Sequence, residues 1–265
     1  MEIGISIFFW NLVLIWTVMT VAWGISLAIR NVTIVDSIWG LGFVLLAWTT
    51  YAATDGAAAR GLLICGLVTV WGGRLAGYLT WRNWKKPEDP RYGRWRKKVG
   101  ERFWIVSLVK VFWIQALFLW VIALGVQYGI AQPSPARLTW LDVVGALIAA
   151  AGIGIEAVAD AQLARFKKDP ENRGRVMDRG LWGWSRHPNY FGESLVWWGI
   201  FFIVLSTPVS FWTVVSPLVI TLVLTKMTGV ALTEKTIKEK RPEYRRYIER
   251  VPAFFPKIPS KRSLS

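Results

Sequence analysis

Arginines alternate with glycines, aromatic rings and polar side chains between residues 161 and 192. Arginine presents a planar fork of donors that suits phosphate oxygens, and glycine lets a backbone approach a ligand closely. Trp and Tyr offer flat surfaces for an adenine or nicotinamide ring. The combination favours a phosphate-bearing cofactor over a plain connecting loop, with Arg165, Arg175 and Arg186 as its candidate cationic contacts.

Two carboxylates precede this region. Glu156 and Asp160 lie four residues apart, so they share one face of a helix, and ionisable groups within an apolar helix usually face a cavity. They could bind ribose hydroxyls or a carboxamide, or they could neutralise nearby arginines. The residue types leave both interpretations open.

A second group of polar residues lies in the first third of the chain. Tyr78 follows Arg74 by one helical turn, and Asp36 lies in an earlier apolar segment. An acid, an arginine and a phenol on neighbouring helices could polarise a carbonyl and deliver a proton. Asp36 and Arg74 could equally form a structural ion pair. With one histidine, His187, and one cysteine, Cys65, the chain offers no multi-histidine or cysteine-based metal site.

The elements that carry these residues are apolar blocks of about 20 residues, the length that crosses a bilayer. Helix is the economical way for such blocks to satisfy their backbone groups in lipid. The sequence therefore predicts an all-α integral membrane protein forming one domain over 1–265, with substrate-side helices in about 1–135 and cofactor-binding helices and loops in about 136–265. The seven predicted spans are about 5–29, 34–53, 61–81, 104–130, 140–160, 194–206 and 210–232. Gly152 and Gly154 lie within an apolar helix and are explained by helix packing.

The charges predict how the spans are oriented. Of the 32 Lys and Arg, 27 fall on one alternating set of loops and tails, and only Arg60 and Arg137 fall on the other. The positive-inside rule then places the N-terminus outside and the C-terminus in the cytoplasm. We expect a multi-pass protein of a bacterial inner membrane, in contact with membrane lipids. Nucleic acid is disfavoured as a partner because no soluble basic domain remains outside the spans, and no obligate protein partner is indicated.

The run from Gly180 to Glu193, GLWGWSRHPNYFGE, followed by Trp197-Trp198-Gly199, resembles the signature of steroid 5α-reductase-like membrane proteins. It is most similar to their bacterial branch, long described only as a domain of unknown function. The resemblance extends over most of residues 36–256. It implies a seven-helix fold that reduces an activated C=C bond with hydride from NADPH, in a lipophilic substrate entering from the bilayer.

By this resemblance Asp160, Arg175, Asn189, Tyr190 and Glu193 hold the cofactor. Tyr78, with Asp36 as its partner, is the carbonyl-side group. His187 either caps the following helix or touches a cofactor phosphate. The Gln-Glu pair that steroid-reducing members carry in their second helix is missing from 34–53, so a fatty-acyl or other lipid enone is as good a candidate substrate as a 4-ene-3-oxosteroid.

Two other functions remain open. Membrane methyltransferases of the isoprenylcysteine carboxyl methyltransferase type also use an Arg-His-Pro-x-Tyr motif and a nearby Glu, and they bind S-adenosylmethionine. That cofactor has no phosphates, so the many arginines would have less to bind. A non-catalytic lipid-binding protein that kept the fold is the third possibility, and cofactor binding distinguishes all three.

Overall fold

Every regular element is a helix in the computed structural model, which describes residues 2–227 and 243–257. The all-α prediction is confirmed for this part of the chain. Five helical stretches in it are long and apolar enough to cross a membrane, judged by length and composition. Such a set is that of a multi-pass membrane protein.

The first four predicted spans correspond to helices with nearly the expected ends. The first three are α1 (Glu2–Ala28), α2 (Ile34–Ala53) and α3 (Ala58–Asn83). The fourth is a run of helical segments: α5 (Phe103–Ser107), a π-helical stretch (Leu108–Trp113), α6 (Ile114–Ile122) and α7 (Leu124–Ala131). A helix that none of the predicted spans covers, α4 (Pro90–Val99), precedes them.

The later spans differ more from expectation. Helix α8 (Trp140–Lys168) continues two turns beyond its predicted end, and α9 (Pro188–Val204) begins six residues before its predicted start. The seventh predicted span contains a 3₁₀ turn (Phe211–Val214), α10 (Val215–Leu222) and a second π-helical stretch (Val223–Met227). Its predicted end, 228–232, lies outside the described residues. A short helix, α12 (Glu243–Arg250), follows.

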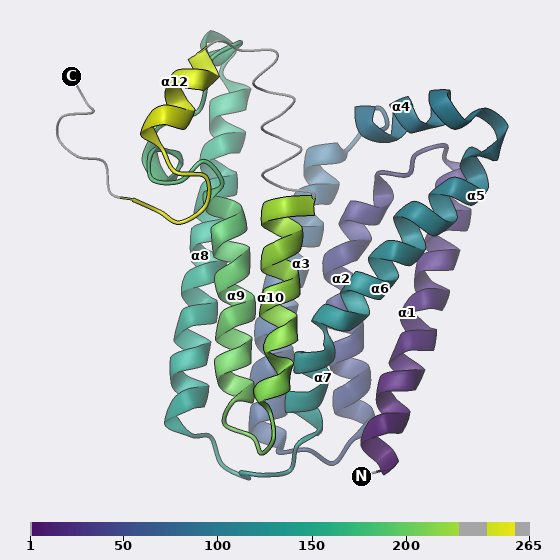
Figure 1. Cartoon of the computed structure of the whole chain (residues 1–265), viewed down its shortest axis with the longest axis vertical. Coiled ribbons are helices and arrows are strands. Elements are labelled where there is room, and N and C mark those ends of the chain that lie inside the picture. The colour runs from purple at the N-terminus through teal and green to yellow at the C-terminus, as the bar shows by residue number, and fades with distance from the viewer. Residues whose placement is uncertain (1, 228–242, 258–265) are drawn as a thin grey trace. The chain divides into compact units, whose positions relative to one another are not determined.

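The chain divides into two compact units. Unit 1 comprises Met1–Val143 and Ile200–Ser216, and unit 2 comprises Val144–Gly199 and Pro217–Ser265. Figure 1 shows α1, α2 and α3 side by side in unit 1, and α8 beside α9 in unit 2. Each unit holds one of the two groups of polar residues identified in the sequence.

Unit 1 is held together partly by a close crossing of α2 and α3. A Cβ atom added to Gly40 would lie 2.5 Å from the carbonyl oxygen of Gly72. A polar network joins three helices elsewhere in the unit: the Asn11 amide donates to Thr50 Oγ1 and to Gln127 Oε1, each at 2.9 Å. Polar groups buried among apolar helices bind one another because lipid offers them no alternative.

A buried ion pair closes one end of unit 1. Arg60 Nε donates to Asp142 Oδ1 at 2.8 Å, and both side chains are at most 1% exposed. The guanidinium also donates to the carbonyl oxygens of Pro135 and Arg137, and Asp142 accepts from the Thr139 amide and hydroxyl. Arg60, which the sequence analysis counted as a loop charge, is thus a structural clamp.

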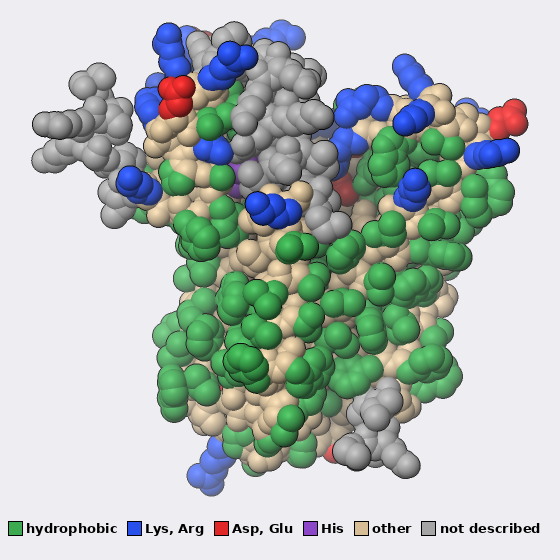
Figure 2. All heavy atoms as spheres, in the orientation of Figure 1, with side chains coloured by type: hydrophobic (Ala, Val, Ile, Leu, Met, Phe, Trp, Pro, Cys, Tyr) green, Lys and Arg blue, Asp and Glu red, His purple; other side chains and the backbone are tan. Residues whose placement is uncertain are grey.

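The distribution of side chains on the surface agrees with a membrane environment. Figure 2 shows hydrophobic side chains over the shafts of the helices, with Lys and Arg gathered near α4 in unit 1 and near α12 in unit 2. Exposed apolar residues on the shafts include Phe9, Val70 and Leu147, at 58%, 59% and 66%. Exposure of this kind is ordinary for side chains that face lipid.

Candidate functional site

The geometry of unit 2 begins with the contact between α8 and α9. A Cβ atom on Gly192 would lie 2.7 Å from the Glu156 backbone nitrogen and 2.7 Å from the Gly152 carbonyl oxygen. The two backbones therefore touch, and no side chain separates them. The packing role predicted for Gly152 is confirmed, whereas Gly154 has nothing within 4 Å of an added Cβ and has no such role.

Buried polar groups lie on the turns next to this contact. Glu156 and Asp160 of α8 are 2% and 5% exposed, and Glu193 of α9 is 7% exposed. The Asn189 amide donates to Asp160 Oδ1 at 3.3 Å. The Asn189 Oδ1 atom is buried, with no hydrogen-bond partner among the described residues, and an orphaned acceptor of this kind calls for a ligand, a water or an ion. The structure thus gathers four of the predicted cofactor residues where two helices meet.

His187 and Tyr190 lie at the start of α9. Their rings stack with centroids 5.4 Å apart and planes only 4° apart. The His187 carbonyl accepts the first helical hydrogen bond from the Phe191 amide at 3.1 Å, and its own amide donates to Ser185 Oγ. His187 therefore occupies the N-cap position of α9 through its backbone groups. Contact with a phosphate stays a prediction.

Arg186 is directed to the C-terminal segment. Its Nη1 atom donates to the carbonyl oxygens of Ile248 and Val251, at 3.1 and 2.6 Å, and its amide donates to the Pro252 carbonyl. Carbonyls at a helix end lack intrahelical donors, so Arg186 caps α12. A cofactor role for Arg186 stays a prediction. Its hydrogen bonds to the end of α12 are a structural role that the sequence did not reveal.

Further contacts fix the same C-terminal segment to the loop before α9. The Tyr247 hydroxyl donates to the Trp182 carbonyl at 2.5 Å, and the Trp182 indole donates to the Ala159 carbonyl of α8. The two remaining arginines of the predicted site, Arg165 at the end of α8 and Arg175 in the loop, are exposed. They can therefore meet a ligand from solvent.

Unit 1 holds the predicted carbonyl-side residues. Tyr78 and Arg74 of α3 are half-buried, and the Arg82 guanidinium lies 5.8 Å from the centre of the Tyr78 ring. The charges that act on Asp36 are those of Arg91, Arg82 and Asp89, and Arg74 is not among them. Arg91 and Asp89 lie at the start of α4 and Arg82 at the end of α3, so charges from both segments act on Asp36. A pairing of Asp36 with Arg74 stays a prediction.

Tyr92 is the residue of this group that the sequence analysis missed. It lies on the buried side of α4, 8% exposed, and the charge of Asp36 acts on its hydroxyl. The signal that could have found it is Asp89-Pro90. An Asp at an N-cap and a Pro at the first helical position predict a helix start, and the Asp89 carboxylate does accept from the Arg91 amide at 2.8 Å.

Two acids hold α4 against the start of α2. Glu88 accepts from the Val32 amide at 3.0 Å and from the Arg96 guanidinium at 2.7 and 3.1 Å, and the Asp89 amide donates to Thr33 Oγ1. Burial raises the pKa of Glu88, but these hydrogen bonds outweigh it and leave the pKa below its usual value. The pKa of Asp89 is lowered in the same way, by Arg91 against burial.

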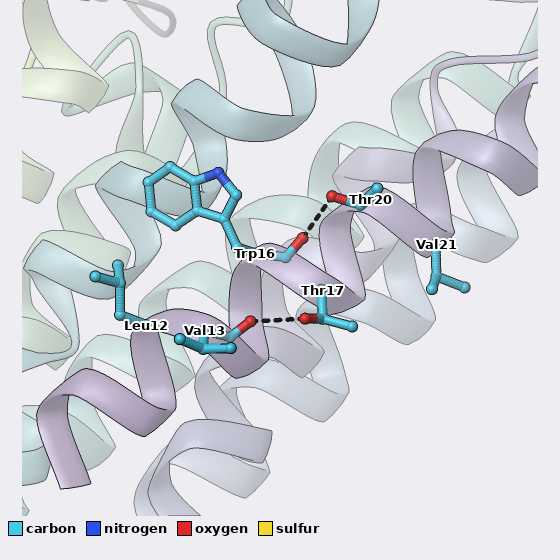
Figure 3. A pocket seen from close by; sticks show the side chains of 6 residues that line it. All are labelled: Leu12, Val13, Trp16, Thr17, Thr20 and Val21. Carbon is cyan, nitrogen blue, oxygen red and sulfur yellow. Dashed lines mark hydrogen bonds between the residues drawn. The ribbon is translucent and has the colours of Figure 1, made fainter. Parts of the chain in front are cut away.

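A groove of about 550 Å³ lies along α1, and none of these residues lines it (Figure 3). It is lined by Leu12, Val13, Trp16, Thr17, Thr20 and Val21. The two threonine hydroxyls donate to carbonyls of their own helix, at 2.8 Å each. The groove therefore suits a hydrocarbon chain and offers no reactive group. No cluster of three or more His, Cys, Asp or Glu in the described part of the chain is placed to hold a metal ion.

Comparison with known proteins adds a family without a known activity. The sequence profile of the family described as a protein of unknown function, DUF1295, matches residues 22–251. An uncharacterised protein of Schizosaccharomyces pombe is 29% identical, over 90% of this chain and 76% of its own length. No solved structure matches.

Proposed function

Because the chain belongs to the DUF1295 family, its activity has to be inferred from the site, and we propose that it is an NADPH-dependent membrane reductase of an activated C=C bond in a lipophilic substrate. The main support is the group of buried carboxylates and Asn189 where α8 meets α9. The resemblance of residues 180–193 to steroid 5α-reductase-like proteins supports the same assignment.

The proposal includes seven spans with the N-terminus outside and the C-terminus in the cytoplasm. Five described helical stretches have the length and composition of spans. We assign the other two spans to α9 and to the shorter apolar stretch Phe211–Lys226. The asymmetry of Lys and Arg supports the orientation.

The residues of unit 2 fit a nicotinamide nucleotide. The carboxylates of Glu156, Asp160 and Glu193 are acceptors for ribose hydroxyls, and the open Asn189 Oδ1 can accept from a carboxamide N–H. Exposed Arg165 and Arg175 are suited to phosphate oxygens. When bound, NADPH supplies a hydride to the β-carbon of an enone.

The residues of unit 1 would act on the carbonyl end of the substrate. A phenol that donates a hydrogen bond to the carbonyl oxygen stabilises the negative charge that develops there. Tyr78 is the phenol assigned by resemblance, and Tyr92 is the phenol that lies beside Asp36. We keep the carbonyl contact on Tyr78, with Asp36 as its partner, and Tyr92 is a second candidate phenol.

The test is equilibrium binding of NADPH, NADH and S-adenosylmethionine to the detergent-purified full-length protein. We expect NADPH to bind, and its Kd to rise at least about tenfold in Asn189→Ala and Arg175→Ala, because each loses a direct contact. Arg173→Ala, which removes another exposed loop arginine, is the matched control and should change little. Turnover of lipid enones would then be measured as the rate at which NADPH is oxidised. Tyr78→Phe should lower kcat by about 10²-fold or more, and Tyr92→Phe tests the second phenol in the same assay.

One observation favours the methyltransferase alternative: three buried carboxylates also suit a ligand with a cationic centre. Binding of S-adenosylmethionine without any nicotinamide nucleotide would refute the reductase proposal and direct the search to methyl acceptors. Binding of neither cofactor would favour the non-catalytic lipid-binding function.

A further inference from the structure

Helix α4 carries five basic residues in ten, and they fall into two classes. Arg91 and Arg96 are bound by acids of the preceding turn, Asp89 and Glu88, at 3.0 and 2.7 Å. The others, Arg94, Lys97 and Lys98, are exposed, and no described carboxylate forms an ion pair with them. Because they are spaced three and four residues apart, they share one side of the helix. We call these three residues the α4 cationic face.

Chain connectivity places α4 close to the ends of two membrane helices. Only residues 84–89 separate it from α3, and only 100–102 separate it from α5. Trp95 lies on α4 and Trp81, Trp84 and Trp104 flank it in the sequence, and all four indoles are between 42% and 67% exposed. Trp prefers the headgroup level of a bilayer, so α4 lies where the headgroups are.

The orientation of α4 is fixed from the protein side. Tyr92 is buried against unit 1, and the Glu88 and Asp89 contacts attach the start of α4 to α2. The cationic face therefore stays on the exposed side of α4, where it cannot rotate to form ion pairs with carboxylates of unit 1. Three like charges held on one side of a helix at a membrane surface are complementary to lipid phosphates, and each cation near an anionic leaflet strengthens attachment severalfold.

We propose that the α4 cationic face is a binding site for the headgroup phosphates of anionic phospholipids. The site does not depend on the reductase proposal, because it uses no residue of the candidate cofactor or carbonyl sites. It gives the basic residues of this segment a defined ligand beyond the general attraction that orients the spans.

The test is native mass spectrometry of the intact, full-length protein titrated with phosphatidylglycerol or with phosphatidylcholine of the same acyl chains. We expect the wild type to prefer phosphatidylglycerol by about tenfold or more. The triple variant Arg94→Gln/Lys97→Gln/Lys98→Gln should lose that preference. Circular dichroism of each variant confirms that the helices are intact.

The matched control removes three exposed cations from the end of α8 and the loop after it in unit 2, as Lys168→Gln/Arg173→Gln/Arg179→Gln. It has the same net charge as the α4 variant and should keep the preference for phosphatidylglycerol. Equal losses in the two triple variants would overturn the proposal in favour of a net-charge effect. An unchanged preference in the α4 variant, or no preference in the wild type, would also overturn it.

Discussion

Replacing Gly192 by alanine tests the contact on which the candidate cofactor site depends. The added Cβ would lie 2.7 Å from two backbone atoms, the Glu156 nitrogen and the Gly152 oxygen. Backbone atoms cannot rotate away as a side chain can, so α8 and α9 must separate by roughly 0.7 Å to restore ordinary contact. Overpacking of this kind costs about 1–3 kcal/mol.

The matched variant is Gly154→Ala, in the same helix pair but with nothing within 4 Å of the new atom. Both changes gain about 1 kcal/mol from the better helix propensity of alanine, so their difference isolates the steric cost. The thermal midpoint is the temperature at which half of the protein remains monodisperse after heating in detergent. Gly192→Ala should melt roughly 2–12 °C below Gly154→Ala. Equal midpoints would refute the close contact between the two backbones.

Three further predictions concern unit 1. Arg60→Gln leaves a buried carboxylate without its cation and should destabilise the protein by about 3–5 kcal/mol, whereas exposed Arg137→Gln should be nearly neutral; labelling of the single, buried cysteine on heating measures both. Asn11→Leu breaks a buried three-helix network and should cost about 1–2 kcal/mol by the same assay, with Thr17→Val on the exposed side of α1 as a neutral control. Glu88→Gln should speed hydrogen exchange in residues 84–99 above about pH 4.5, and the difference from the wild type should disappear as the pH falls below the lowered pKa of Glu88.

The sign of the pH effect follows from the lowered pKa of Glu88. Its contribution is complete above the unfolded value, near 4.5, and is lost as the pH falls through the lower folded value. Because the Arg96 side chain is 39% exposed, solvent screening limits the ion pair to about 1 kcal/mol or less. A difference between variant and wild type that persisted at low pH would contradict this account. An Arg60→Gln variant as stable as Arg137→Gln would contradict the first of the three predictions. An Asn11→Leu variant as stable as Thr17→Val would contradict the second.

The apolar segments were predictable because membrane spans are encoded locally. A block of about 20 apolar residues specifies a span whatever it packs against, and α1, α2 and α3 begin and end near the expected residues. The pairing of side chains across the fold is not encoded in this way. Arg60 was assigned to a loop because its partner, Asp142, is 82 residues away in the sequence.

The same limit explains the outcome at the candidate sites. Glu156, Asp160 and Asn189 could be grouped from the sequence. The two acids are four residues apart on one helix, and Asn189 lies in the motif of residues 180–193. For Asp36 the sequence offers the arginine and phenol of the next helix as partners, but it does not reveal that Arg91 and Asp89 of the α4 segment also act on it. Helix α4 itself is short and strongly charged, so hydropathy could not reveal it, and only its capping residues signal it.

The contact between α8 and α9 suggests how stability and ligand binding can be separated. The two helices match in antiparallel order: Gly199 meets Ala149, Gly192 meets Glu156, and Asn189 meets Asp160. A Cβ on Gly199 would lie 2.5 Å from the Ala149 nitrogen, so Gly199→Ala should destabilise unit 2 at least as much as Gly192→Ala. Gly199 is nearly three turns from Asn189, while Gly192 is within one. Only Gly192→Ala should therefore shift the acceptors of the proposed site and weaken NADPH binding. If both variants lost binding equally, the loss would report general destabilisation and not the geometry of the site.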